Sequence, residues 1–540
     1  MSTKPWYHRT TIYQIYPRSF YDSNDDGIGD IQGILQKLDY LKELGFETLW
    51  FSPFFESPQK DFGYDISNYT GVAPEYGSVD DALQLIEQVH RRGMRIVVDM
   101  VMNHTSNEHP WFKESRSSRD NPKADWYLWR DKPNNWQSVI GGRGWHYVEE
   151  RGQYYWASFL PFQPDLNYRN SEVKKTMFDI VRFWLGKGVD GYRLDIFNSI
   201  YKDAEYRNNP FSFQFLPKDT DQSRFFQELK YTVNLPESFH FARELRSVCS
   251  EHGEKMLLGE VSGPRDVIRK FLGNGQNEGL GLVFDFEMLN FDFNAKYFYE
   301  LIRDIESQYP EPFMPVYVFG NHDNRRSIKK LGGDVQKAKL LQLLQFTVRG
   351  VPCLYYGEEI GMTNVKIPFE QAQDPLPHKF GFIPWLVYDK LGTTINRDEV
   401  RTPMQWKASK NAGFSQAQKT WLPVNADYQS VNVENEQQET DSLLNAFREL
   451  LKIRNGSSAL RSGSLELRNR NELPDTVLMY KRRSDNDEIT VVMNFSKNEC
   501  QFEFKENNWK KVFSLNMKDG FSGGIIKLDG FGGMILGRTI

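Results

Sequence analysis

Three carboxylates, two histidines and an arginine lie at or just after short apolar segments of this 540-residue chain. They are Asp195, Glu260 and Asp323, His104 and His322, and Arg193. Paired carboxylates can cleave a glycosidic bond when one attacks the anomeric carbon and the other, protonated, donates to the leaving oxygen. Arg193 precedes Asp195 by two residues, so both side chains point to the same face of a strand. These residue types favour glycoside hydrolysis if the fold brings them together.

The histidines suggest a second chemistry, since barrel hydrolases can also hold a catalytic metal through imidazole ligands. Neither the HxH nor the HExxH spacing accompanies His104 or His322. The sequence therefore disfavours a catalytic metal.

Short apolar, β-rich segments alternate with helical patterns along the chain. Eight such segments are Thr11–Phe20, Glu47–Phe54, Met94–Met102, Gly191–Phe197, Lys255–Val261, Leu282–Leu289, Pro315–Phe319 and Val351–Tyr356. This alternation predicts an α/β fold, a (β/α)8 TIM barrel. In such a barrel the carboxyl ends of the strands share one mouth, where the candidate residues would meet.

Two intervals depart from the barrel pattern. Residues 103–170 are rich in Trp, Gly and Pro and show no clear helical pattern, which predicts a loop-rich subdomain inserted after strand three. From residue 462 to 540, short alternating segments separated by turn residues predict an all-β C-terminal domain. The barrel itself would comprise residues 1–102 and 171–461.

Composition limits the classes of protein. Lys and Arg number 67 against 72 Asp and Glu, a net charge of −5 that argues against nucleic-acid binding. Three scattered cysteines argue against a disulfide framework, and neither a signal-peptide pattern nor an 18-residue apolar run occurs. We expect a soluble, cytoplasmic protein with no membrane partner, either a monomer or a weak homo-oligomer.

A polar loop follows the first apolar segment and is spaced like the start of a calcium loop. The side chains of Asp22, Asn24, Asp26 and Asp30 supply oxygens at positions 1, 3, 5 and 9. The backbone carbonyl of Ile28 supplies the oxygen at position 7. Position 12 is Gly33 rather than the glutamate of an EF-hand. The spacing predicts a structural Ca²⁺ or Mg²⁺ site, and a polar turn without metal is the alternative.

A series of segments resembles, in order, the α-amylase family of glycoside hydrolases, and within it the oligo-1,6-glucosidase and α-glucosidase branch. They are IYQIYPRSFYDSNDDGIGD, DFGYDISNY, VVDMVMNHTS, QPDLN, GYRLDIFN, GEV, FGNHDNRR, YYGEEIGM and RTPMQW. The resemblance implies that Asp195 is the nucleophile and Glu260 the general acid/base. Asp323 matches the carboxylate that grips the sugar hydroxyls, and Arg193 matches the partner that orients the nucleophile.

The resemblance also implies a pocket for a terminal glucosyl residue. The matching substrate-binding positions are Asp61, Tyr64, His104, Phe159, Arg193, His322, Arg326 and Arg397. The two histidines would bind the glucose, and Asp61 with Arg397 would close the pocket. Tyr64 would be a stacking platform with Phe159 beside it. Arg326 resembles an arginine of the acceptor side, and the family's metal falls on the Asp22–Asp30 loop.

The expected activity is that of a retaining, exo-acting α-glucosidase acting on disaccharides and short oligosaccharides without an organic cofactor. Ile196, directly after the proposed nucleophile, is β-branched like the valine of α-1,6 enzymes and favours α-1,6 over α-1,4 linkages. Where members of the family have a phenylalanine before a glycine-rich turn, this chain has Ile140. The alternatives are a glucosyl-transferring enzyme, such as a sucrose isomerase or a trehalose-forming enzyme, and a non-enzymatic binding subunit.

Overall fold

The computed structural model describes residues 4–218, 220–275, 277–380, 394–506, 508–517 and 520–539. The chain divides into two compact units. The first unit comprises Met1–Gly29, Gln36–Thr48 and Met288–Ile540, and the second comprises Asp30–Leu35 and Leu49–Glu287.

Eight parallel strands form one sheet in the order β13-β12-β9-β5-β2-β1-β15-β14. They are β1 (Ile12–Ile15), β2 (Thr48–Phe51), β5 (Arg95–Met100), β9 (Gly191–Leu194), β12 (Met256–Gly259), β13 (Leu282–Val283), β14 (Val316–Val318) and β15 (Val351–Tyr355). Each lies within one of the eight predicted segments, and their order is that of a (β/α)8 barrel. The predicted fold class is confirmed.

The helices of the second unit begin at residues suited to cap them. Ser78 and Asp81 form a capping box at the start of α4, and the Asn170 side chain accepts from the Glu172 amide at the start of α6. The helices of this unit are α2 (Ile31–Gln36), which runs to the unit boundary, α4 (Val79–Arg91), α5 (Pro110–Ser117), α6 (Ser171–Gly186), α7 (Pro236–Ser250) and α8 (Arg265–Ile268).

Strands β9 and β12 approach closely at Gly191. A Cβ atom there would stand 2.2 Å from the carbonyl oxygen of Met256, so only glycine fits. This contact sets the register in which Leu258 pairs with Arg193. The spacing of the strands that carry Arg193 and Glu260 therefore depends on Gly191.

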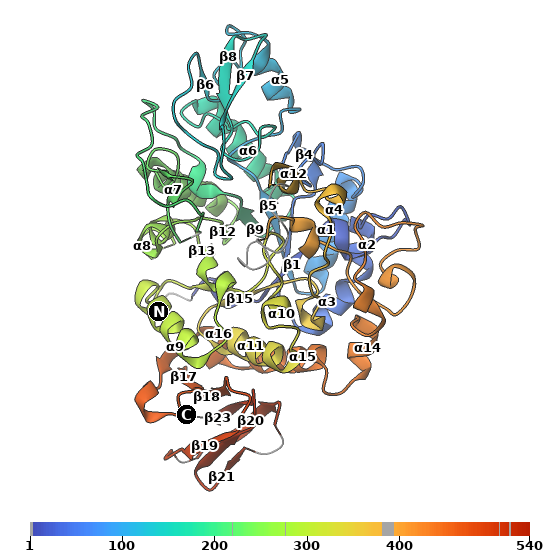
Figure 1. Ribbon diagram of the computed structural model, residues 1–540, viewed down its shortest axis with the longest axis vertical. Helices are drawn as coiled ribbons and strands as arrows, with labels where there is room; N and C mark the ends of the chain where they lie inside the picture. Colours follow the sequence, from blue (N-terminus) through green and yellow to red (C-terminus); the bar gives the residue numbers. More distant parts are fainter. Residues whose placement is uncertain are drawn as a thin grey trace. The chain divides into compact units, whose positions relative to one another are not determined.

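The segment 103–170 contains a helix that the sequence analysis did not predict. Helix α5 begins at Pro110, where the proline suits the first turn and the His109 side chain accepts from the Trp111 amide. Its eight residues are too few for apolar periodicity to reveal. In Figure 1, α5 lies beside β6 (Trp129–Arg130), β7 (Trp145–Val148) and β8 (Gln153–Trp156).

The remaining short strands of the second unit form two hairpins. The β3 strand (Phe55–Glu56) pairs with β4 (Asn68–Val72), and β10 (Ser223–Arg224) pairs with β11 (Gln227–Glu228). The first hairpin frames the turn that carries Asp61 and Tyr64.

The first unit contains β1, β14 and β15 of the eight-stranded sheet, several helices and a C-terminal region of strands. Residues 31–44 form two helices, because Lys37 between them is non-helical. The helices of this unit are α1 (Pro17–Phe20), α3 (Leu38–Leu44), α9 (Ala295–Gln308), α10 (Ser327–Lys330), α11 (Val335–Thr347), α12 (Pro375–Phe380), α14 (Val433–Gln438), α15 (Leu443–Gly456) and α16 (Ser458–Ser462).

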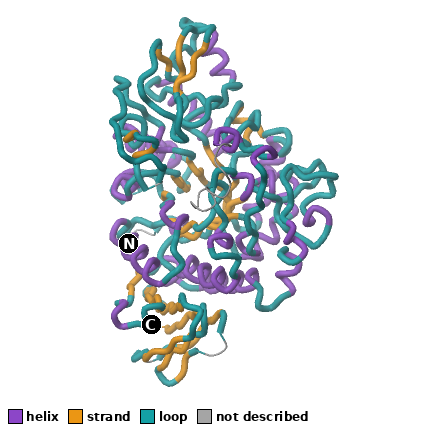
Figure 2. Tube along the Cα trace, viewed as in Figure 1, coloured by secondary structure: helices purple, strands orange, loops and turns teal. Residues whose placement is uncertain are grey.

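From residue 464 onward the described chain is built mainly from strands, with a short 3-10 helix at Arg470–Glu472 (Figure 2). One sheet has the order β16-β17-β18-β23-β20 and the other β19-β22-β21. Their bounds are β16 (Ser464–Leu467), β17 (Val477–Arg483), β18 (Asp487–Asn494), β19 (Cys500–Glu503), β20 (Lys510–Leu515), β21 (Phe521–Ser522), β22 (Ile525–Leu528) and β23 (Gly533–Thr539). The predicted all-β character is confirmed, while the domain boundaries stay a prediction.

Two further observations concern the environment of the protein. No helix among the described residues is long and apolar enough to cross a bilayer. Cys249 and Cys353 are buried and Cys500 is partly buried, and none of these three described residues forms a disulfide. A cytoplasmic location stays a prediction.

Candidate functional site

One buried guanidinium joins three carboxylates in the second unit. Arg193, on β9, is 2% exposed. Its Nη1 donates to Asp99 at 2.9 Å and to Asp195 at 2.8 Å, and its Nη2 donates to Glu260 at 2.5 Å. The predicted grouping of Arg193, Asp195 and Glu260 is therefore present, and Asp99 is an additional member of the cluster.

The parallel register explains why these side chains converge. Asp99 on β5 lies opposite Arg193 on β9. The Glu260 amide continues the ladder by donating to the Leu194 carbonyl. Because carboxyl ends of neighbouring parallel strands share one edge, the residues that end β9 and follow β12 lie side by side.

The chain turns sharply after Asp195. Ile196 has φ 32° and ψ 43°, a left-handed conformation that is strained for a β-branched residue. This turn directs the Ile196 amide at Glu260 Oε2, at 3.2 Å. The strained residue therefore gives Glu260 a second donor besides Arg193.

Burial and neighbouring charges shift the pKa values of this cluster in opposite directions. Burial alone would lower the pKa of Arg193, but the surrounding carboxylates, Asp99 first, hold it above its ordinary value. Burial raises the pKa of Asp99, with the Arg193 charge acting against it. The arginine is thus a permanent positive charge between the carboxylates.

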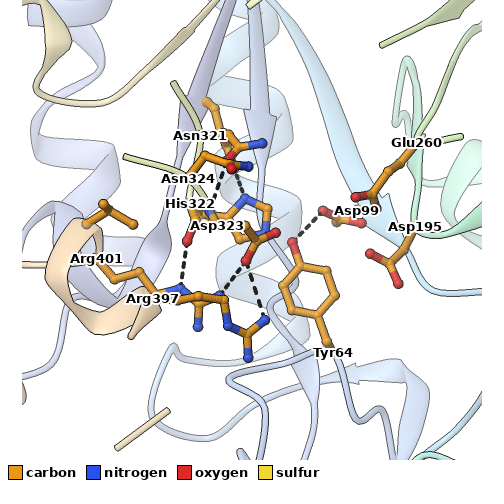
Figure 3. A network of polar contacts seen from close by, with 12 residues as sticks. Tyr64, Asp99, Asp195, Glu260, Asn321, His322, Asp323, Asn324, Arg397 and Arg401 are labelled. Atoms are coloured by element: carbon orange, nitrogen blue, oxygen red, sulfur yellow. Dashed lines mark hydrogen bonds and ion pairs between the residues drawn. The ribbon is translucent and has the colours of Figure 1, made fainter. Parts of the chain in front are cut away.

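Asp99 also holds the predicted stacking residue. The Tyr64 hydroxyl donates to Asp99 Oδ2 at 3.1 Å, as Figure 3 shows, and the Trp50 indole donates to the same oxygen at 3.3 Å. Tyr64 is buried beside the Arg193 guanidinium, which lies 5.8 Å from its ring centre. The ring is thus fixed against the carboxylate cluster.

Asp61 is held by a tight turn. The Tyr64 amide donates to the Asp61 carbonyl across Phe62 and Gly63, whose φ values are 46° and 100°. A Cβ atom at Gly63 would lie 2.7 Å from the Pro53 carbonyl oxygen, so glycine is required there. The Asp61 carboxylate, itself buried, accepts from Gln163 Nε2 at 2.9 Å.

His104 is buried and neutral. Burial lowers its pKa, although nearby Asp165 acts in the opposite direction. Its Nε2 lies 3.0 Å from the Tyr64 carbonyl oxygen, and its Nδ1 lies 3.2 Å from the Asn103 amide nitrogen. Only an imidazole with its proton on Nε2 satisfies both contacts.

Phe159 and Ile140 lie in neighbouring loops. Both are partly buried, and Ser138 bonds to both loops: its hydroxyl donates to the Phe159 carbonyl and accepts from the Ile140 amide. The roles of these two side chains at a sugar stay predictions.

A second cluster, in the first unit, surrounds Asp323. Arg401 Nη2 donates to Asp323 Oδ1 at 2.7 Å, and Arg397 Nη1 approaches the same oxygen at 3.4 Å (Figure 3). His322 Nε2 lies 3.1 Å from Oδ2. The Asp323 side chain is 30% exposed, so it can still contact a ligand.

The partners of this second cluster are themselves fixed. Gln14 donates from Nε2 to His322 Nδ1 at 2.8 Å, which leaves the imidazole proton on Nε2 facing Asp323. Arg397 makes a two-pronged contact with buried Asp374, from Nε at 2.9 Å and from Nη2 at 2.7 Å. Burial would raise the pKa of Asp374, but the Arg397 charge outweighs it and holds this pKa below its ordinary value.

Arg326 is fully buried in the first unit. Its Nη1 donates to the Tyr356 carbonyl at 2.7 Å and its Nη2 to the Val400 carbonyl at 3.0 Å. Its guanidinium also lies over the Tyr355 and Tyr356 rings. These contacts tie loops together, and an acceptor-side role for this arginine stays a prediction.

The sequence analysis did not name several residues of these clusters. They are Gln14, Asp99, Gln163, Asp374 and Arg401. Gln14, Asp99, Gln163 and Arg401 stand inside segments that carried the resemblance. For Gln14 and Asp99, a polar residue within an apolar strand was the available signal. Asp374 stands in a loop without periodic pattern, and no sequence signal marked it.

The loop from Asp22 to Ile28 is a run of side-chain-capped turns. The Asp22 carboxylate accepts from the amides of Asn24, Asp25 and Gly27, at 3.1, 2.8 and 2.8 Å. The Asp26 carboxylate accepts from Ile28, and Asp30 accepts from Gly33 within the second unit. Among the described residues, no group of three or more His, Cys, Asp or Glu side chains is arranged to hold a metal ion.

Comparisons with known proteins place these features in a wider context. Residues 14–463 match the family model of the alpha amylase catalytic domain. An oligo-1,6-glucosidase of Parageobacillus thermoglucosidasius is 37% identical over 539 residues, covering 93% of this chain and 92% of that protein. The solved alpha-glucosyl transfer enzyme XgtA gives a TM-score of 0.89 at 36% identity, covering 99% of this chain and 100% of that one. The trehalulose synthase MutB of Pseudomonas mesoacidophila gives 0.88 at 30% identity with the same coverage.

The carboxyl group of Asp65 gives this region a pH-dependent stability. Burial raises the pKa of Asp65 to about 7, against donors that include the Asp61 amide. Above the ordinary pKa of about 4, the unfolded chain releases this proton while the folded chain keeps it until about pH 7. The folded state then binds more protons, so the free energy of unfolding falls with rising pH, by at most about 1.4 kcal/mol per pH unit.

Asp65→Asn abolishes this titration. The difference in unfolding free energy between variant and wild type, measured in denaturant, should therefore shift in the variant's favour as pH rises from about 4 to about 7. A difference that stays constant over this range would contradict the raised pKa.

Proposed function

Because this chain belongs to the alpha-amylase family of glycoside hydrolases, we propose that it is a retaining, exo-acting α-glucosidase acting on disaccharides and short oligosaccharides. The observation that carries this proposal is the shared guanidinium of Arg193, which binds Asp195 through Nη1 and Glu260 through Nη2. Two nitrogens of one planar group hold the two carboxyl groups close together. Such closeness favours the spacing of about 5–5.5 Å found in retaining enzymes over the wider spacing that admits a water molecule.

The reaction proceeds by double displacement. Asp195 attacks C1 of the terminal glucosyl residue as Glu260 donates its proton to the bridging oxygen, so that the C1–O bond breaks and a C1–carboxylate bond forms. The leaving sugar departs with that proton. Glu260 then removes a proton from water, and the resulting hydroxide displaces Asp195 from C1. Arg193 orients both carboxyl groups throughout.

The remaining predicted residues would bind the glucosyl residue. Asp323, partly exposed and charge-paired with Arg401, would accept hydrogen bonds from sugar hydroxyls, and His322 would assist it. Tyr64 would stack on the ring, and buried His104, whose Nε2 bonds to the Tyr64 carbonyl, would lie beside it at the glucose. The match of these positions to the family's motifs supports the assignment.

Three other predicted residues would complete the pocket. Asp61, fixed by its turn, and Arg397, fixed by Asp374, would close the pocket at the terminal hydroxyl. Phe159 would extend the stacking surface beside Tyr64. These roles rest on the resemblance and on the rigid support that Asp61 and Arg397 receive.

Linkage preference follows from the residue next to the nucleophile. Ile196 is apolar and β-branched like the valine of α-1,6 enzymes, and its amide donates to Glu260 Oε2. Together with the similarity to oligo-1,6-glucosidases, this favours α-1,6 over α-1,4 bonds.

A glucosyl-transferring activity is the second candidate. It is favoured by the similarity in structure to XgtA and to trehalulose synthase MutB. The same covalent intermediate serves both activities, and only the acceptor differs.

The substitution Asp195→Asn removes the attacking oxygen charge while preserving volume. We expect hydrolysis of an aryl α-glucoside to fall by at least about 10³-fold with an unchanged melting temperature. The matched control Asp266→Asn alters an exposed carboxylate on α8 and should keep wild-type activity. More than a tenth of wild-type activity in Asp195→Asn would contradict the nucleophile assignment.

Product analysis tests both stereochemistry and specificity. Proton NMR of the first glucose released should show the α-anomer, because two inversions at C1 give net retention. Separation of the products from isomaltose, maltose, sucrose and trehalose should show isomaltose cleaved fastest. Initial β-glucose would overturn the double displacement, and isomerised sucrose without free glucose would favour the transferase.

We also propose that the Asp22–Asp30 loop binds a structural Ca²⁺ or Mg²⁺. The donor set supports this, since hard cations prefer carboxylate, amide and carbonyl oxygens at alternating positions of a turn. Asp22 is buried, and so is Asp30. Asp26, Asn24 and the Ile28 carbonyl would complete the set. A bound cation would compensate the buried negative charge and take no part in the reaction.

Chelation provides the test of this loop. The melting temperature should fall on treatment with EDTA and recover on adding Ca²⁺ or Mg²⁺, because a cation bound only to the folded state stabilises that state. Asp22→Asn should abolish the EDTA effect. An unchanged melting temperature, with no Ca²⁺ or Mg²⁺ in elemental analysis, would refute the site.

A further inference from the structure

A chain of buried polar groups in the second unit connects the inserted segment to His104. Asp165 pairs with Lys202, Lys202 bonds to Asn103, and Asn103 bonds to His104. Segment 103–105 lies along segment 164–166, where the Thr105 amide donates to Pro164 and the Leu166 amide donates to Asn103. The backbone thereby holds these side chains in one place.

Lys202 is the unusual member of this chain of contacts. It is 4% exposed and follows the proposed nucleophile by seven residues, on the loop after β9. Its Nζ donates to Asn103 Oδ1 at 2.7 Å and pairs with the fully buried Asp165 carboxylate. Asp165 is fixed in turn by the Ser158 amide and hydroxyl. A buried lysine is costly, which suggests that its position serves a purpose.

The chemistry of the ammonium group decides how Asn103 is oriented. An ammonium carries only donors, so it must face the carbonyl oxygen of the Asn103 amide. The NH₂ group of Asn103 then points to His104 Nδ1, at 3.2 Å. Because Nδ1 must accept, the one proton of the neutral imidazole resides on Nε2, where it donates to the Tyr64 carbonyl.

We propose that Lys202 is a positioning residue that keeps the His104 imidazole in its Nε2–H form, by orienting Asn103. That Nε2–H donates to the Tyr64 carbonyl and so fixes the backbone of the proposed stacking residue. Without Lys202 the Asn103 amide can rotate by half a turn and present its oxygen to Nδ1, which draws the imidazole proton to that side and removes the bond to the Tyr64 carbonyl. The inference rests on the proposed function only in assigning Tyr64 to the sugar.

The first test examines the wild-type protein and needs no change at Lys202. Nitrogen NMR of protein labelled with ¹⁵N-histidine distinguishes the two neutral forms, and the His104 signal is identified by its loss in His104→Gln. We expect a protonated Nε2 and an unprotonated Nδ1 in the wild type. A proton on Nδ1 would overturn the proposal whatever the activity of the protein.

The second test uses a pair of variants that separates Lys202 from its counter-ion. The double variant Lys202→Met/Asp165→Asn removes both buried charges together and so avoids leaving one unpaired. The control Asp165→Asn retains the ammonium at Asn103 but removes its carboxylate partner, so the melting temperatures of both variants are first compared to establish that each is folded. The Nε2–H form should persist in the control and be lost or mixed with the other form in the double variant.

Kinetics give an independent readout. In the double variant, KM for an α-glucoside should rise by about tenfold, because loss of the His104–Tyr64 hydrogen bond releases the backbone of the stacking residue, with a smaller change in kcat. The control should stay within about threefold of the wild-type KM. Wild-type KM and tautomer in the folded double variant would refute the role of Lys202. A wild-type protein that cleaves no α-glucoside would instead refute the proposed function, while the NMR result would still decide the tautomer.

Discussion

The carboxylate cluster of the second unit depends on the hydrogen bonds and ion pairs of a single side chain, the Arg193 guanidinium. It is buried and always charged, and its two terminal nitrogens reach Asp99, Asp195 and Glu260. Removing it would leave three carboxylates in one poorly solvated region, where their repulsion would be strong. Its position depends on strand spacing, because the close approach at Gly191 sets the register of β9 on β12. Backbone geometry and side-chain charge are therefore coupled at this point.

The first unit also contains arginines that are fixed by a buried contact and that donate to a carboxylate. Arg397 is anchored by Asp374, which leaves one of its nitrogens beside Asp323. Arg401 is anchored by the His322 carbonyl and donates to the same carboxylate. In each case a buried contact fixes the guanidinium, and a more exposed carboxylate receives it. A carboxylate that is held by rigid partners yet reaches solvent can bind a sugar hydroxyl without first losing conformational freedom.

The supporting hydrogen bonds also settle proton positions. Gln14 directs the proton of His322 to Nε2. Lys202 does the same for His104 by orienting Asn103. Both imidazoles therefore carry their proton on Nε2, where His104 contacts the Tyr64 carbonyl and His322 faces Asp323. Preorganised donors of this kind need no rearrangement when a substrate binds.

The sequence by itself determined the eight strands, and it placed Arg193, Asp195 and Glu260 at strand ends that the structure brings together. It could do so because strand ends carry polar residues after apolar segments, a local pattern that the barrel topology turns into a common edge. It did not reveal α5, whose eight residues are too short for periodicity.

Only the tertiary structure decided which polar groups contact one another. Asp374 and Gln163 act through partners 23 and 102 residues away, a separation that no local pattern encodes. Arg326 is the opposite case, because its motif was recognised in the sequence while its contacts with the backbone carbonyls of distant residues were not. Burial and contact depend on how distant segments pack, because hydrogen bonds must be satisfied in three dimensions rather than along the chain.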